Sequence, residues 1–127
     1  MKKVLFIDND TMTNLHHKII MESFVDSHYD MEVVFEHNSL QALESISSQR
    51  PDQLPVLIFI DVYIPNFTAR SFLNAYAKIP YSSPNVIILN SARFIEDSTP
   101  WLRHHLVLDV MPKPLTLPYL TSWIGIP

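Results

Sequence analysis

Residues 4–13 read VLFIDNDTMT and place four apolar residues directly before the polar triplet Asp8, Asn9 and Asp10. A continuous apolar run of this kind is typical of a strand that is buried on both faces of a parallel sheet. The polar residues that follow are typical of a helix start. The stretch therefore predicts a buried first strand that leads into a helix, with acidic side chains at the carboxyl end of the strand.

Four further apolar runs follow, and segments with helical patterning separate them. The runs are MEVVF (31–35), VLIFI (56–60), VIIL (86–89) and LVLDVM (106–111), of which MEVVF is expected to be the more exposed. Helices are expected at 11–26, at 39–48 behind an Asn38 or Ser39 cap, at 68–78, after Ser98-Thr99-Pro100, and at 117–124. This fivefold alternation predicts an α/β protein with a flavodoxin-like, doubly wound (βα)5 fold and a parallel five-stranded sheet in the order 2-1-3-4-5.

The apolar spacing also predicts which side chains pack inside. The first helix carries its apolar residues at Met12, Leu15, Ile19, Ile20 and Phe24. The six histidines are interpreted as solvated surface residues, because no set of them has the spacing of a zinc site. Trp101 and Trp123 are interpreted as packing residues.

Composition excludes several classes of protein. A chain of 127 residues with a formal charge of −4 has the size of one domain, and its nine basic residues are scattered, which disfavours a nucleic-acid or anionic membrane surface. The apolar run at the N-terminus is too short for a signal peptide or a membrane span, and there is no cysteine, so a cytoplasmic location is expected. The single glycine excludes glycine-rich phosphate loops.

Polar residues gather where the central strands are expected to end. They are Asp8, Asn9 and Asp10, then Asp61, then Asn90 and Ser91, and finally Lys113. The carboxyl ends of parallel strands share one edge of the sheet, so these side chains are expected to converge there. Converging carboxylates need a cation, and oxygen ligands suit Mg²⁺. An aspartate can also act as a nucleophile toward phosphorus, with a lysine and a hydroxyl neutralising the transferred phosphoryl group.

With these motifs in place, the chain resembles the response-regulator receiver domains of bacterial two-component systems. The likeness covers the whole sequence and rests on four segments in order, which are FIDND (6–10), LIFIDVYIP (57–65), VIILNSA (86–92) and MPKPLT (111–116). It implies a single receiver domain over residues 1–127 with no output domain, which accepts a phosphoryl group and is not a turnover enzyme.

The resemblance implies a role for each residue of the phosphorylation site. Asp61 would accept the phosphoryl group, Ser91 would hydrogen-bond it, and Lys113 would pair with it. The peptide bond between Lys113 and Pro114 would be cis. The donor would be a histidine kinase or a phosphotransfer protein.

The resemblance also implies a magnesium site, but with a departure from the family. Asp8, Asn9, Asp61 and the backbone carbonyl of Tyr63 would hold the ion. A carboxylate is usual at the position of Asn9, so weaker metal binding is expected, and Asp10 is a possible compensating ligand.

Two further departures concern signalling. The turn after the phosphoacceptor strand usually contains glycine and reads Asn66-Phe67-Thr68-Ala69 here, and the aromatic switch residue three positions before the lysine is Val110. A receiver without an output domain would signal to a downstream protein by docking. The face formed by the fourth helix, fifth strand and fifth helix is the candidate surface, and the sequence predicts no oligomeric state.

Three alternatives stay open. In a receiver-like binding module that is never phosphorylated, Asp61 and Lys113 would form a purely structural ion pair, and Asn9 and Val110 favour this reading. The opening stretch also resembles haloacid-dehalogenase-type phosphatases, in which Asp8 would attack phosphorus and Asp10 would act as acid and base. That reading ranks lower, because such enzymes need a further acid pair after the lysine, and residues 114–127 contain no Asp or Glu. Finally, Asp8 and Asp10 could be acids that merely favour a helix start.

Overall fold

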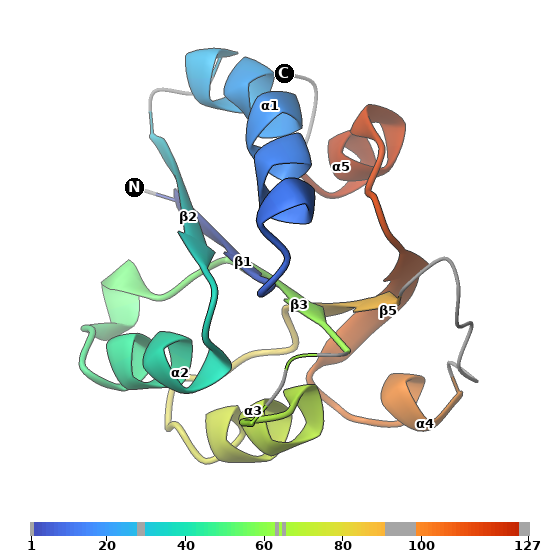
Figure 1. Cartoon of the computed structure of the whole chain (residues 1–127). Helices are drawn as coiled ribbons and strands as arrows, with labels where there is room; N and C mark the ends of the chain where they lie inside the picture. Colours follow the sequence, from blue (N-terminus) through green and yellow to red (C-terminus); the bar gives the residue numbers. More distant parts are fainter. Residues whose placement is uncertain (1, 28–29, 63, 65, 91–98, 125–127) are drawn as a thin grey trace.

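The protein is a three-layer α/β structure with one parallel sheet between two layers of helices (Figure 1). The computed structural model describes residues 2–27, 30–62, 64, 66–90 and 99–124. Its strands are β1 (Lys2–Ile7), β2 (Met31–Glu36), β3 (Leu57–Asp61), β4 (Val86–Asn90) and β5 (Val107–Pro112). Its helices are α1 (Thr11–Ser27), α2 (Ser39–Ser47), α3 (Ala69–Tyr76), α4 (Thr99–Leu102) and α5 (Leu117–Ile124), with a 3₁₀ turn, η1 (Pro51–Gln53).

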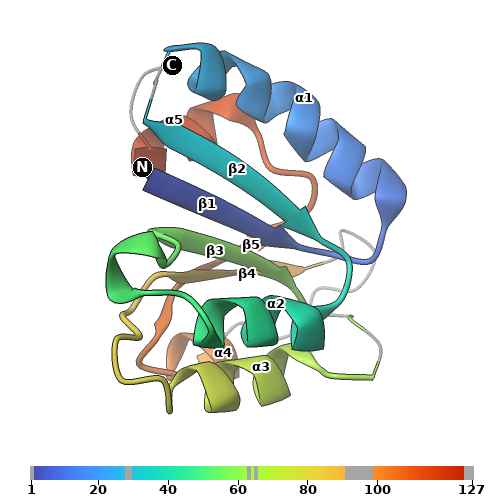
Figure 2. The same ribbon diagram turned by 90° about the vertical axis from the view of Figure 1, so that its left-hand side faces the viewer.

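The strand order is β2-β1-β3-β4-β5 and all neighbours are parallel, which confirms the predicted doubly wound topology. Helices α1 and α5 cover one face of the sheet, and α2, α3 and α4 cover the other (Figure 2). Every residue of β3 and β4 is buried, whereas β2, at the edge, is mostly half-buried. The more exposed character predicted for the second strand is therefore confirmed.

Two apolar cores form, one on each face of the sheet. The core under α2, α3 and α4 includes Phe72, Tyr76 and the predicted packing residue Trp101. The core under α1 and α5 contains a row of stacked rings in which Phe6 of β1 lies against Phe35 of β2 and Phe59 of β3, with ring centroids 5.1 and 4.7 Å apart. Because Phe35 and Phe59 are both in register with Phe6, this row fixes the alignment of the three strands.

Side chains mark the starts of α2 and α3. The Asn38 side chain accepts a hydrogen bond from the Gln41 amide, and the Thr68 hydroxyl accepts one from the Ser71 amide. Such caps satisfy amides that have no partner inside the helix. Asn38, one of the two caps considered from the sequence, is thus the one used.

The sidedness of α1 differs from the prediction. Met12, Leu15 and Ile19 are exposed to 70%, 48% and 60%, whereas Asn14 and His17 are buried together with Met21 and Phe24. The physical reason is that Asn14 and His17 make hydrogen bonds underneath the helix, which the apolar residues could not make. The interpretation of all histidines as solvated is likewise wrong for His17, which is fully buried. Trp123, expected to pack, remains 38% exposed.

No helix among the described residues is both long enough and apolar enough to cross a membrane.

Candidate functional site

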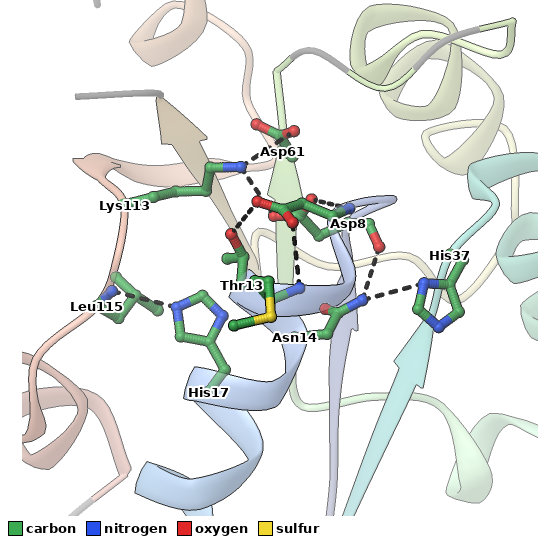
Figure 3. Close-up of polar contacts among 10 residues, drawn as sticks. Asp8, Thr13, Asn14, His17, His37, Asp61, Lys113 and Leu115 are labelled. Atoms are coloured by element: carbon green, nitrogen blue, oxygen red, sulfur yellow. Dashed lines mark hydrogen bonds and ion pairs between the residues drawn. The ribbon is translucent and has the colours of Figure 1, made fainter. Parts of the chain in front are cut away.

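The candidate site lies at the carboxyl edge of the sheet, where the ends of β1, β3 and β5 bring charged residues together (Figure 3). Asp8 directly follows β1, Asp61 is the last residue of the adjacent β3, and Lys113 directly follows β5. Both carboxylates are almost completely buried. The convergence expected for these three residues from their positions at the strand ends is therefore present in the structure.

Lys113 bridges the two carboxylates. Its Nζ lies 3.1 Å from Oδ2 of Asp8 and 3.4 Å from Oδ2 of Asp61. Burial opposes the charged form of Lys113, but the neighbouring Asp8 and Asp61 carboxylates outweigh burial and raise the pKa of Lys113 above its usual value. The lysine therefore stays protonated, and its positive charge lies between the two carboxyl groups.

The backbone around Lys113 is also held in place. Its amide donates to the carbonyl of Asn90 at the end of β4, at 2.7 Å. The peptide bond between Lys113 and Pro114 is cis, as the resemblance implied. The segment that carries the Lys113 ammonium is therefore held to β4 by a backbone hydrogen bond.

Asp10 caps helix α1. Its Oδ1 accepts a hydrogen bond from the Met12 amide at 3.1 Å, and its Oδ2 accepts one from the Thr13 hydroxyl at 2.7 Å. The bond from Thr13 is the main reason that the pKa of Asp10 is lowered. Both oxygens are thus engaged by the first turn of the helix, which is the role considered for an acid at a helix start.

Oxygen atoms suited to a magnesium ion are present, but the set is sparse. Asp8 and Asp61 supply two buried carboxylates beside the exposed Asn9. Among the described residues, no group of three His, Cys, Asp or Glu side chains is arranged to hold a metal ion. Mg²⁺ commonly takes one or two carboxylates and keeps several waters, and a pocket with excess negative charge fits such an ion. The residues therefore fit Mg²⁺, with one charged ligand fewer than an aspartate at position 9 would give.

Two of the expected site residues, Tyr63 and Ser91, lie outside the described residues. The turn after β3 is described in part. Asn66 has a positive φ of 70°, a conformation that glycine adopts freely and asparagine tolerates better than most residues. Asn66 thus takes the conformation for which the glycine usual in this turn would be suited, and the Ser39 hydroxyl donates to the carbonyl of the next residue, Phe67.

A set of polar residues behind the carboxylates was missed by the sequence interpretation. The Asn14 side-chain amide donates to the backbone carbonyl of Asp8 at 2.7 Å and lies 3.3 Å from Nδ1 of His37. His17 accepts a hydrogen bond from the Leu115 amide (Figure 3). The available signal was their spacing, because Asn14, His17, Met21 and Phe24 recur at intervals of three and four residues and form one helical face.

The face considered for docking a downstream protein has its own polar contact. Val110 of β5 is half-buried and packs on the α2–α4 side of the sheet. Its neighbour Asp109 accepts a hydrogen bond from the Tyr119 hydroxyl of α5 at 2.9 Å. Burial and this hydrogen bond raise the pKa of Tyr119 above its usual range, so the phenol stays protonated.

Comparison with known proteins identifies the fold. No protein-family model and no curated protein matches the sequence. Solved structures do match. A response-regulator receiver domain protein from Clostridium thermocellum is 19% identical with a TM-score of 0.74, and the match covers 98% of this chain and 92% of that one. A putative response regulator from Chloroflexus aurantiacus is 16% identical with a TM-score of 0.76, with coverage of 97% and 93%.

A third match is the receiver domain of a sensor histidine kinase from Pseudomonas aeruginosa, at 18% identity and a TM-score of 0.69, with 98% of each chain covered. That domain is described with a magnesium ion coordinated in its active-site cleft. The flavodoxin-like architecture and the near-complete coverage define the class, a doubly wound α/β fold with a parallel five-stranded sheet. Within that class, the chain has the fold of a response-regulator receiver domain.

Proposed function

We propose that this protein acts as a receiver in a phosphorelay, accepting a phosphoryl group on Asp61 from a histidine kinase or a phosphotransfer protein. The observation that carries the proposal is the position of Lys113 Nζ, within 3.4 Å of both the Asp61 and the Asp8 carboxylates. A buried aspartate beside a lysine at the carboxyl edge of a doubly wound sheet can act as a nucleophile whose product is stabilised by the lysine.

The transfer reaction needs little from the protein besides position and charge. An Asp61 carboxylate oxygen attacks phosphorus, the new P–O bond forms, and the P–N bond of the phosphohistidine breaks, leaving its electron pair on the donor nitrogen. Lys113 is already protonated and its ammonium reaches both carboxylates, so it can pair with a phosphoryl oxygen on Asp61. We assign Ser91 as a hydroxyl donor to the same group. The protein is not expected to turn over a substrate.

The cofactor proposed for this reaction is Mg²⁺. Asp8, Asp61, Asn9 and the Tyr63 carbonyl would hold it, and Asp10 would contribute only by giving up the contacts that cap α1. When bound, the ion would neutralise negative charge that develops on the phosphoryl oxygens.

The exposed side of α1 supports a docking site for the phosphoryl donor. Met12, Leu15 and Ile19 line this side in the turns that follow directly after the acidic triplet. A groove of about 1050 Å³ runs along the same helix toward β2. Apolar side chains grouped beside a charged pocket are typical of a protein-binding surface. A donor bound there would bring its phosphohistidine to the carboxyl edge of the sheet.

For the output, we retain the face formed by α4, β5 and α5. Leu102, Leu117 and Trp123 are partly exposed there, and a tryptophan of this kind can anchor a partner. Val110 in place of an aromatic residue means that any coupling between Asp61 and this face would not use an aromatic switch at that position.

A second candidate function is a binding module that is never phosphorylated. Asn9 favours it, because it supplies an amide where a third carboxylate is usual, and Lys113 bridges the Asp8 and Asp61 carboxylates. In that case the ion pair only stabilises the fold, and the docking surfaces carry the function.

The test is to incubate the protein with Mg²⁺ and acetyl phosphate and to measure intact mass, alongside Asp61→Ala and Asp8→Ala. The proposal predicts addition of one phosphoryl group to the wild-type protein and none to Asp61→Ala. A product that survives Asp61→Ala and disappears in Asp8→Ala would instead indicate the phosphatase-like chemistry at Asp8. An absence of any response of the wild-type protein to acetyl phosphate or beryllofluoride in amide NMR spectra would contradict phosphorylation and favour the binding module.

A further inference from the structure

His17 of α1 lies below the candidate site in Figure 3. Its side chain is fully buried, and its ring stacks on Phe6 at a centroid distance of 5.1 Å. Its Nε2 accepts a hydrogen bond from the Leu115 amide at 3.1 Å. Nδ1 is also buried, and no residue in the described part of the chain is its hydrogen-bond partner. Burial of His17 therefore costs the hydration of Nδ1, while Nε2 provides an acceptor for the Leu115 amide.

The acceptor matters because of where Leu115 stands in the chain. Leu115 comes two residues after Lys113, and the intervening Pro114 has no amide hydrogen. The Leu115 amide is thus the first backbone donor after the lysine, and it points at α1 (Figure 3). On the other side of the lysine, its own amide donates to Asn90 at 2.7 Å. The backbone of Lys113 is consequently held at one end by β4 and at the other by α1.

The same histidine is connected to the strand that carries the first carboxylate. Phe6, on which the ring of His17 stacks, lies two residues before Asp8 in β1. His17 therefore contacts both the segment that carries the ammonium and the strand that carries its partner. A leucine could fill the same volume, but it would leave the Leu115 amide buried and unpaired.

We propose that His17 is a positioning residue for Lys113, which fixes the backbone around the lysine and thereby holds the ammonium between Asp8 and Asp61. The inference rests on the proposed function, because the ammonium is the group that would pair with the phosphoryl oxygens. It requires a neutral imidazole protonated at Nδ1, since Nε2 is the acceptor. The mechanism itself needs no contact between His17 and the phosphoryl group.

The experiment compares His17→Leu, His17→Gln and the control His16→Leu. Leucine removes the acceptor, glutamine offers a side-chain carbonyl oxygen in its place, and His16 is the adjacent, exposed histidine. Phosphorylation by acetyl phosphate with Mg²⁺ is expected to slow on the order of tenfold or more in His17→Leu. His17→Gln should recover much of the rate, and His16→Leu should match the wild type. A folded His17→Leu protein that reacts at the wild-type rate, or a glutamine variant as slow as the leucine variant, would overturn the proposal.

Two NMR measurements keep the inference separate from the proposed function. In the unmodified wild-type protein, ring ¹⁵N shifts should show His17 as the Nδ1-protonated tautomer, and the Nε2-protonated tautomer would overturn the proposal. The ¹³Cε and ¹⁵Nζ signals of Lys113 should move toward those of a free lysine in His17→Leu, and unchanged signals would also refute it. Neither readout needs phosphorylation. A wild-type protein that accepts no phosphoryl group therefore refutes the proposed function alone. The two NMR measurements still test whether His17 positions Lys113.

Discussion

The burial of His17 predicts that the protein loses stability in mild acid. Burial, and to a lesser extent the neighbouring charges of His16 and Lys113, lower the pKa of His17 from 6.5 to about 4. Above about pH 7 the ring is neutral in both the folded and the unfolded chain. As the pH falls through 6.5, only the unfolded chain takes up the proton, so the free energy of unfolding falls. The loss is complete near pH 4, where the folded protein is also protonated.

The size of this effect follows from the two pKa values. Integrating the difference in bound protons between pH 7 and pH 5 gives a loss of about 2 kcal/mol in the free energy of unfolding. Over the whole window, the limit is about 3.5 kcal/mol, since each pKa unit corresponds to about 1.4 kcal/mol. Because single domains are stable by only about 5–15 kcal/mol, the loss at pH 5 is a large fraction of the total.

Urea denaturation at a series of pH values between 7.5 and 4.5 measures the effect. The wild-type protein is compared with His17→Leu, which cannot titrate at this position, and with His16→Leu, which removes the exposed neighbour. With a urea m-value of roughly 1–3 kcal/mol per M, a loss of about 2 kcal/mol lowers the wild-type midpoint by on the order of 1 M. The difference between the wild type and His17→Leu should shrink by that amount as the pH falls. His16→Leu should keep most of the wild-type loss, because burial and not the charge of His16 is the main cause of the lowered pKa of His17. Parallel pH profiles for the wild type and His17→Leu would show that His17 is not held neutral, and would refute the reasoning.

Three further predictions concern residues around the site and the core. Asn9→Asp adds a third carboxylate to the pocket, so it should raise the affinity for Mg²⁺ by on the order of tenfold and lower the stability of the protein in EDTA. Equal Mg²⁺ affinities of the variant and the wild type by calorimetry would show that position 9 does not face the ion. Asn66 has a positive φ, so Asn66→Val should lower the free energy of unfolding by about 1–2 kcal/mol, whereas Asn66→Gly should leave the stability nearly unchanged. Similar urea midpoints for the valine and glycine variants would contradict this prediction. The Arg70 guanidinium lies 4.8 Å from the Trp101 ring centroid, so Arg70→Gln should lower the free energy of unfolding by about 0.5–1 kcal/mol and change tryptophan fluorescence. An unchanged free energy of unfolding together with unchanged fluorescence would rule out a stabilising contact.

The fold could be predicted because its signals are local and mutually consistent. Strands β3 and β4 read as uninterrupted apolar runs, and the structure buries every residue of both. Strand order then follows from the limited set of sheets that alternating strands and helices can form. The carboxyl ends of parallel strands necessarily share an edge, so Asp8, Asp61 and Lys113 could be brought together without any knowledge of side-chain contacts.

The details of the site could not be predicted, because they depend on contacts between distant segments. Nothing in the sequence near His17 indicates that its ring accepts a hydrogen bond from Leu115, which is 98 positions away. At Asp10 the difficulty is different, because the local sequence is compatible with two roles. A carboxylate next to the acidic pocket is equally compatible with a metal ligand and a helix cap, and only the positions of Met12 and Thr13 show that the cap is formed.

The unexpected sidedness of α1 connects the fold to the proposed function. A helix normally turns its apolar residues inward, but here Asn14 and His17 occupy the inner side and hold the backbone at Asp8 and Leu115. Because these polar residues take positions that apolar ones would otherwise fill, Met12, Leu15 and Ile19 are left in solvent beside the same pocket. Under the proposed function, one side of the helix would support the phosphoacceptor geometry, and the other would provide an apolar surface for a protein that delivers the phosphoryl group. Polar substitution of Ile19 should weaken transfer from such a donor while leaving the reaction with acetyl phosphate unchanged, since the small molecule needs no docking surface.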